Sequence, residues 1–133
     1  MVAARYPRRV PDGVARRVLV VDDEPQVRAT VREALTFEGY EVSEASNGVE
    51  ALALLQTAQP EAIVLDLWMP VMDGWTFRRA QLVSHPQIPV IVVSALDLSS
   101  EHIEELRAGA VIGKPFDLDT LYSAVEEVLK RGA

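Results

Sequence analysis

The sequence alternates five times between a short apolar run and a longer segment with helical spacing, and this alternation most restricts its fold. Three runs are apolar throughout: residues 18–21, 62–65 and 90–93. Unbroken apolar runs of this length are typical of parallel strands that are covered on both faces. Two weaker candidates are the alternating segment 41–45, which we expect at a sheet edge, and the very short segment 111–112.

Helices are predicted between and after these strands. The expected helices begin at Pro25, at Ser46 or Asn47, near Thr76, between Asp97 and Ser99, and at Asp117. Gly39 and Pro60 end the first two, and Gly109 is expected to end the fourth. The third and fourth have few regularly spaced apolar residues, whereas the fifth carries one continuous apolar stripe.

This order of elements predicts an α/β fold with a doubly wound five-stranded parallel sheet. Right-handed crossovers place helices on both faces of such a sheet. Ligand sites in these folds form at the carboxyl ends of the strands, near the point at which the strand order reverses. The 133 residues suffice for one domain that buries about two-thirds of its unfolded surface.

Charge is unevenly distributed along the chain. The first 17 residues contain five arginines and a single acid, whereas the remaining 116 residues hold 8 basic and 19 acidic side chains. Because an acidic body repels nucleic-acid phosphates, we expect no direct binding to nucleic acid. Residues 1–16 are expected to form a disordered leader, since Pro7, Pro11 and Gly13 interrupt any helical pattern. Contact between its arginines and an acidic partner is the alternative.

Composition narrows the possible environments. The chain has no cysteine, which excludes disulfides and thiolate metal sites. Its apolar runs are too short to cross a membrane. The start of the chain carries arginines and no apolar stretch of signal-peptide length, so we expect a cytoplasmic protein without membrane contact.

Polar residues follow four of the five predicted strands at the point where each ends. They are Asp22 and Asp23 after the first strand, Asp66 after the third, Ser94 after the fourth and Lys114 after the fifth. Three carboxylates held together repel one another unless a cation compensates, and a single lysine supplies too little positive charge. Carboxylate oxygens suit Mg²⁺. The sequence therefore predicts a magnesium site at this edge of the sheet.

Such a site is suited to phosphoryl transfer, which needs positioning and charge neutralisation more than covalent chemistry from the protein. Asp66 would be the carboxylate nucleophile and would form an acyl phosphate. Mg²⁺, Lys114 and the hydroxyl of Ser94 would then hold the phosphoryl oxygens.

Five motifs together resemble those of bacterial response-regulator receiver domains. They are LVVDDE at residues 19–24, IVLDLWMP at 63–70, MDG at 72–74, VSA at 93–95 and KPF at 114–116. The resemblance covers residues 17–131 and implies the strand order 2-1-3-4-5 of the flavodoxin-like fold, which the spacing does not itself derive.

The resemblance also implies roles for individual residues. Asp23, Asp66 and the backbone carbonyl of Trp68 would ligate Mg²⁺ directly, and Asp22 would act mainly through water. Ser94 and Lys114 would bind the phosphoryl group. The bond between Lys114 and Pro115 is expected to be cis. Gly74 is interpreted as a turn residue that needs permissive backbone angles, or else as an ordinary glycine at a helix start.

Two positions depart from the family pattern. Receivers usually carry Tyr or Phe three residues before the lysine, where this chain has Val111, so the usual aromatic movement after phosphorylation has no counterpart here. Trp68 places a bulky indole two residues after Asp66, where it would either restrict the attacking water or anchor a partner.

These features predict a stand-alone receiver that acts as a phosphorylation-dependent switch. The donor would be a sensor histidine kinase or a histidine phosphotransfer protein, and the output an unidentified partner protein. The domain would catalyse its own phosphorylation and dephosphorylation without being a turnover enzyme. Three alternatives remain: a phosphorylation-independent scaffold, a receiver fragment of a longer regulator, and an enzyme that uses Asp66 as its nucleophile. The enzyme would need a substrate pocket and a general acid, and the sequence shows neither.

Overall fold

The computed structural model describes residues 15–95 and 97–132, and within these ranges five strands alternate with five helices. The elements are β1 (Arg17–Val21), α1 (Pro25–Phe37), β2 (Glu41–Ala45), α2 (Gly48–Thr57), β3 (Ala62–Asp66), α3 (Gly74–Ser84), β4 (Val90–Ser94), α4 (Ser100–Leu106), β5 (Ala110–Gly113) and α5 (Leu118–Gly132). All paired strands are parallel, in the order β2-β1-β3-β4-β5. The predicted fold class and strand order are confirmed.

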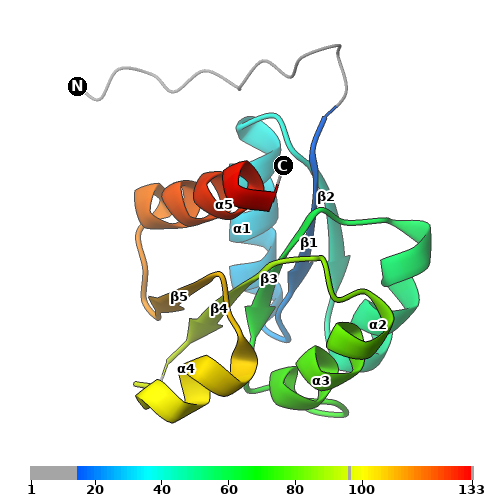
Figure 1. The fold of residues 1–133 in the computed structure, drawn as a ribbon. Helices are drawn as coiled ribbons and strands as arrows, with labels where there is room; N and C mark the ends of the chain where they lie inside the picture. Colours follow the sequence, from blue (N-terminus) through cyan, green and yellow to red (C-terminus); the bar gives the residue numbers. More distant parts are fainter. Residues whose placement is uncertain (1–14, 96, 133) are drawn as a thin grey trace.

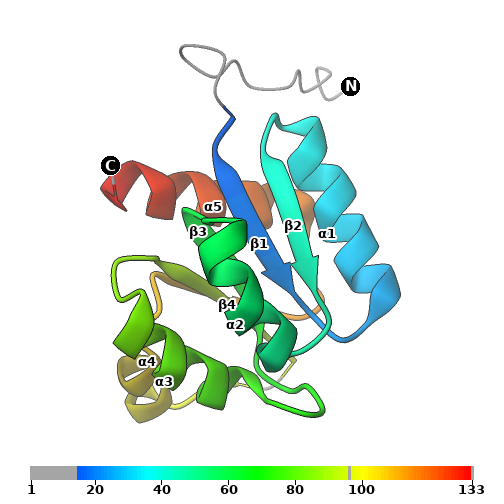
Figure 2. The same cartoon turned by 90° about the vertical axis from the view of Figure 1, so that its right-hand side faces the viewer.

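The sheet separates two apolar clusters. Figure 1 and Figure 2 show the helices that lie on its two faces. Because successive strand residues point to opposite faces, Leu19 and Val21 join one cluster while Val18 and Val20 join the other. Helices α2, α3 and α4 cover the first cluster, and α1 and α5 cover the second. Both faces of the central strands are therefore buried, which is why their sequences are apolar throughout.

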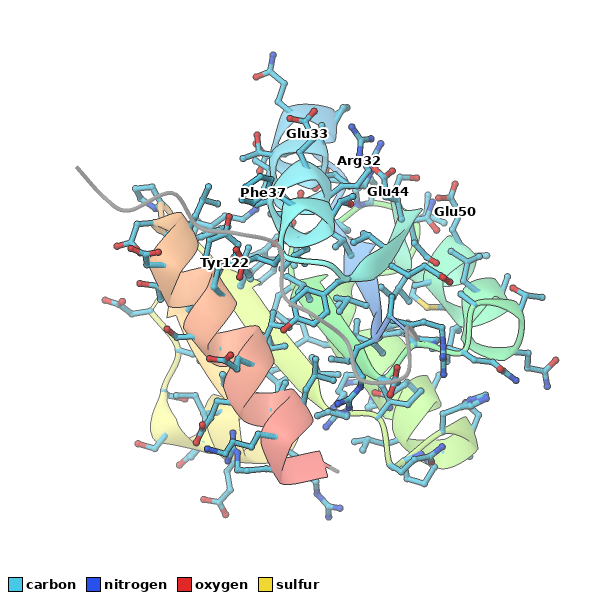
Figure 3. The ribbon with its side chains drawn as sticks, turned by 90° about the horizontal axis from the view of Figure 1, so that it is seen from above. Arg32, Glu33, Phe37, Glu44, Glu50 and Tyr122 are labelled. Carbon is cyan, nitrogen blue, oxygen red and sulfur yellow. The ribbon has the colours of Figure 1, made fainter. Side chains whose placement is uncertain are left out.

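Strand β2 lies at one edge of the sheet, as its alternating sequence predicts. Its Glu44 pairs with two arginines of α1: the distances are 3.3 Å to Nε of Arg28 and 3.2 Å to Nη1 of Arg32. Figure 3 shows Arg32 and Glu44 pointing toward one another at this edge. Charged side chains on an edge strand oppose pairing with another chain.

Helix boundaries follow local capping. Asn47, rather than Ser46, caps α2, since its Oδ1 accepts from the backbone N–H of Glu50 at 3.0 Å. Helix α3 begins earlier than expected because Asp73 caps it through the N–H of Thr76 at 2.8 Å.

The predicted end of the fourth helix at Gly109 is wrong. Helix α4 stops at Leu106 because Arg107 adopts a left-handed conformation, with φ of 49°. The N–H of Gly109 then donates to the carbonyl of Val90 at 2.8 Å, which leads the chain into β5.

The expected leader falls largely outside the described residues, which begin at Ala15. Arg16 contacts the domain: its Nε lies 2.7 Å from Oε2 of Glu61, and its carbonyl accepts from the N–H of Glu41 at 2.9 Å. Within the described ranges, no helix has the length and apolar character that crossing a membrane requires.

The loop between β3 and α3 contains a strained turn. The N–H of Met72 donates to the carbonyl of Pro70 at 2.8 Å, which closes a γ-turn centred on Val71. Val71 has a φ of 70°, and its side chain is 80% exposed. A β-branched residue is unfavourable at this backbone angle, and no burial compensates the strain.

Replacing Val71 with glycine should therefore stabilise the protein. We expect Val71→Gly to raise the free energy of unfolding by about 1 kcal/mol, because relief of strain exceeds the added flexibility of the unfolded chain. Urea denaturation measures the difference. Val83→Gly, at an exposed position within α3, is the control and should destabilise. A Val71→Gly protein less stable than the original would show that the turn is not strained.

Candidate functional site

Three aspartates meet at the carboxyl edge of the sheet. Asp22 and Asp23 follow β1, and Asp66 is the last residue of β3, the strand that pairs with β1. Each offers a carboxylate oxygen, and these three oxygens lie within 4.8 Å of one another. Asp22 and Asp66 are buried, whereas Asp23 is partly exposed. The point at which the strand order reverses thus concentrates negative charge in a small volume.

The backbone holds Asp22 in place. Its N–H donates to the carbonyl of Ala45 in β2 at 3.1 Å, and its carbonyl accepts from Nη1 of Arg28 at 2.7 Å. Its carboxylate Oδ1 accepts from the N–H of Glu24 at 2.9 Å. These contacts fix the orientation of Asp22 but do not involve its second carboxylate oxygen, Oδ2.

Lys114 brings a positive charge to this cluster. It follows β5 and precedes Pro115, and the bond between them is cis, as expected. The carboxylate oxygens around its Nζ belong to Asp22 (3.0 Å), Glu24 (3.1 Å) and Asp66 (3.7 Å). Burial lowers the pKa of Lys114, but the hydrogen bond and charge of Asp22, the charge of Asp66 and the hydrogen bond to Glu24 together raise it above its ordinary value. Lys114 therefore remains protonated.

Glu24 is a neighbour of Lys114 that sequence reasoning missed. It occupies the N-cap position of α1, but its side chain makes no capping hydrogen bond and reaches Lys114 instead. Asp, Asn, Ser and Thr are preferred at N-caps. The unusual glutamate before the helix that begins at Pro25 was therefore the sequence signal that this side chain has another role.

Asp66 is the most strongly perturbed carboxylate at the site. Burial, followed by the charge of Asp22, raises its pKa to about 6. Lys114 and the N–H of Trp68, 3.4 Å from Oδ1, oppose the rise without cancelling it. One lysine thus leaves an excess of negative charge around Asp66. The three aspartates fit a hard divalent cation such as Mg²⁺, which accepts several carboxylate oxygens.

Ser94 and Trp68 flank this cluster. Ser94 is the buried last residue of β4, opposite Gly113 of β5, and its carbonyl accepts from the N–H of Lys114 at 2.8 Å. Trp68 lies just beyond Asp66 with 52% of its surface exposed, between the buried residues Leu67 and Met69.

Gly74 is needed for close approach, and its interpretation through permissive backbone angles is wrong. It does not have a positive φ. A Cβ atom at this position would lie 2.6 Å from the carbonyl oxygen of Asp66 and 2.7 Å from Cα of Leu67. The N–H of Gly74 donates to the carbonyl of Leu67 at 2.9 Å. The start of α3 therefore packs directly against the chain that carries Asp66.

The raised pKa of Asp66 predicts a pH-dependent stability in the absence of metal. Ionising Asp66 is less favourable in the folded than in the unfolded protein, so the metal-free protein should lose stability as the pH rises from about 4 to about 6. Asp66→Asn removes this titration. At neutral pH, with a chelator present, it should be more stable than the original by about 1–3 kcal/mol. Below about pH 4 the gain should vanish. Denaturation curves at several pH values measure the effect, and a constant difference would contradict it.

Comparison with known proteins identifies the family. The model of the response regulator receiver domain matches residues 18–126. Response regulator MprA from Mycobacterium sp. (strain KMS) is 41% identical over 117 residues, which are 86% of this chain and 51% of that protein. The chain thus spans about half the length of the curated relatives it matches.

Solved structures of receiver proteins have the same fold as this chain. The CheY-like receiver domain protein from Methanospirillum hungatei JF-1 has a TM-score of 0.83 at 27% identity, over 90% of this chain and 97% of that one. Chemotaxis protein CheY4 of Vibrio cholerae has a TM-score of 0.81 at 33% identity, over 86% of this chain and 99% of that one. The chain belongs to the response-regulator receiver family of two-component signalling.

Proposed function

We propose that this receiver domain accepts a phosphoryl group on Asp66 in the presence of Mg²⁺, and that the phosphorylated form regulates a partner protein. The observation that carries the proposal is the arrangement of three carboxylates within 4.8 Å, with the ammonium group of Lys114 3.7 Å from Asp66. The donor is a histidine kinase or a histidine phosphotransfer protein, as the family implies.

Each residue has a distinct task in the transfer. A carboxylate oxygen of Asp66 attacks the phosphorus of a phosphohistidine, the P–N bond breaks, and its electron pair stays on the imidazole nitrogen. Lys114 neutralises negative charge on the phosphoryl oxygens, and the hydroxyl of Ser94 donates a hydrogen bond to one of them. Asp23, Asp66 and the backbone carbonyl of Trp68 would hold Mg²⁺, with Asp22 acting through water. When bound, the ion supplies the positive charge that one lysine cannot.

Val111 favours a second candidate, a scaffold with the receiver fold that signals without phosphate. This residue stands where receivers usually carry an aromatic side chain, and it is 40% exposed on β5.

For the phosphorylated domain, we assign the conformational response to α4 instead of to an aromatic side chain on β5. Leu106 is the only buried residue of this helix, so few contacts oppose its movement.

The acceptor assignment is tested by replacing Asp66. After incubation with acetyl phosphate and Mg²⁺, intact-mass measurement should show one phosphoryl group on the original protein and none on Asp66→Asn, because the amide is not a carboxylate nucleophile. Asp23→Asn should keep the acceptor but need a higher Mg²⁺ concentration. No adduct on the original protein would favour the scaffold, and a normal yield on Asp66→Asn would place the acceptor elsewhere.

Trp68 is expected to prolong the lifetime of the acyl phosphate. Its indole lies two residues from Asp66, and its one polar group, the ring N–H, is a donor that cannot accept a proton from an attacking water. We expect Trp68→Asn to lose its phosphoryl group up to about tenfold faster, which needs only about 1.4 kcal/mol of lost barrier. The decay of both purified phosphoproteins is compared at one Mg²⁺ concentration.

Val49→Asn, at an exposed position in α2, is the control for this comparison and should decay at the original rate. Decay of Trp68→Asn that is no faster would exclude a shielding role and leave partner binding as the function of Trp68. Leu96, two residues after Ser94, lies outside the described residues, so its predicted role in closing the other side of the site stays a prediction.

A further inference from the structure

Helix α3 buries a cation on the side that faces α4. Arg78 is 4% exposed, and Gln81, one turn later, is fully buried. A helix face that packs on a core is normally apolar, so this pair requires compensation. The compensation comes from hydrogen bonds: Nε of Arg78 donates to the carbonyl of Leu106 at 2.8 Å, and Nη2 donates to the carbonyl of Arg107 at 2.9 Å.

The same pair also holds the connection between α3 and β4. Nη1 of Arg78 donates to the side-chain oxygen of Gln81 and, at 3.3 Å, to the carbonyl of Ile88. Nε2 of Gln81 donates to the carbonyls of His85 at 2.6 Å and Ile88 at 3.2 Å. Two side chains of one helix thus bind the end of α4 and the approach to β4.

The hydrogen bonds of the buried guanidinium of Arg78 depend on the position of α4. They are three backbone carbonyls and one side-chain amide. The carbonyls of Leu106 and Arg107 lie at the C-terminal end of α4, where backbone acceptors lack helical partners and the helix dipole is negative. Burial, together with the charge of Arg107, lowers the pKa of Arg78 only to about 10, so the guanidinium stays charged at neutral pH. Moving this end of α4 would leave a buried charge with fewer acceptors.

The N-terminal end of α4 is held much less firmly. Ser99 caps it, with Oγ accepting from the N–H of His102 at 3.2 Å. The ring of His102 meets Trp75 of α3 edge-on, with centroids 5.2 Å apart, and His102 is itself exposed. Residues 100–105 are all exposed, so burial anchors the helix only at Leu106.

We propose that Arg78 and Gln81 fix the C-terminal end of α4, so that phosphorylation of this domain moves only the N-terminal turn of the helix. The second half of this statement rests on the proposed function, whereas the first half concerns the resting protein. Arg78 is here a positioning residue that makes no contact with the phosphoryl site. The partner then reads a turn that pivots about Leu106, and the C-terminal end of the helix stays in place.

The first experiment tests the attachment in the resting protein by hydrogen exchange. Arg78→Met keeps the length of the side chain and removes its donors. The matched control is Arg79→Met, because Arg79 is the next residue, is exposed, and bonds only to Oγ1 of Thr76 at 3.3 Å among the contacts of the described residues. We expect the amides of Arg107 and Gly109 to exchange at least about tenfold faster in Arg78→Met and unchanged in Arg79→Met.

Amides of β3 distinguish local loosening from general destabilisation. If residues 63–65 accelerate as much as residues 107–109, Arg78 supports the whole fold and the proposal is overturned. Should Arg78→Met fail to fold, Arg78→Lys replaces it, because a single ammonium group keeps the charge but cannot reach the acceptors on both segments. Unchanged exchange at residues 107–109 in the folded variant would also overturn the proposal.

The second experiment adds beryllium fluoride and Mg²⁺ to mimic the phosphoryl group. In the original protein, protection should change at residues 100–103 and stay constant at 107–109; in the Arg78 variant the change should extend to 109. Equal changes over 100–109 in the original protein would overturn the pivot. If the mimic changes nothing anywhere, the proposed function fails, whereas the resting comparison still decides whether Arg78 and Gln81 hold α4.

Discussion

The close approach of the carboxylates of Asp22, Asp23 and Asp66 is the constraint on which the site depends. The parallel sheet brings β1 and β3 together, so the acids that follow them share one small volume. Lys114 supplies one positive charge and contacts two members of the cluster. Burial, and after it the charge of Asp22, raises the pKa of Asp66 to about 6. A carboxylate that is costly to ionise is stabilised when a cation binds beside it.

The backbone around the cluster is arranged to keep these charges close together. Gly74 lets α3 begin directly against Asp66, where any side chain would collide with the carbonyl oxygen. The turn at Val71 accepts an unfavourable φ so that the chain returns to Gly74 within a few residues. Glu24 gives up a capping hydrogen bond for a contact with Lys114. Local stability is sacrificed at several positions around one site, as is common where function constrains geometry.

We propose that the response to phosphorylation reaches the surface by a route other than the one usual in receivers. Val111, an exposed residue of β5, has no aromatic ring that could move inward after phosphorylation. Helix α4 is short and is attached to α3 through the guanidinium of Arg78. Because α4 is held at its C-terminal end and is capped only by Ser99 at its N-terminal end, we expect the N-terminal end to move. The buried pair on α3 thereby connects the core to the element that we expect to respond.

The sequence by itself determined where the strands lie along the chain and which five polar residues follow them, because apolar periodicity and strand-end position are local properties. The family and the strand order came from the resemblance of its motifs to those of receiver domains. Tertiary structure decided the end of α4, where the N–H of Gly109 bonds to Val90 of a neighbouring strand. It also decided the reason for Gly74, which lies in the distance to Asp66 rather than in its own φ. The sequence of α3, with few regularly spaced apolar residues, gave no indication that Arg78 and Gln81 are buried. Their burial depends on carbonyls of Leu106 and Arg107, and only the folded chain brings those carbonyls within reach.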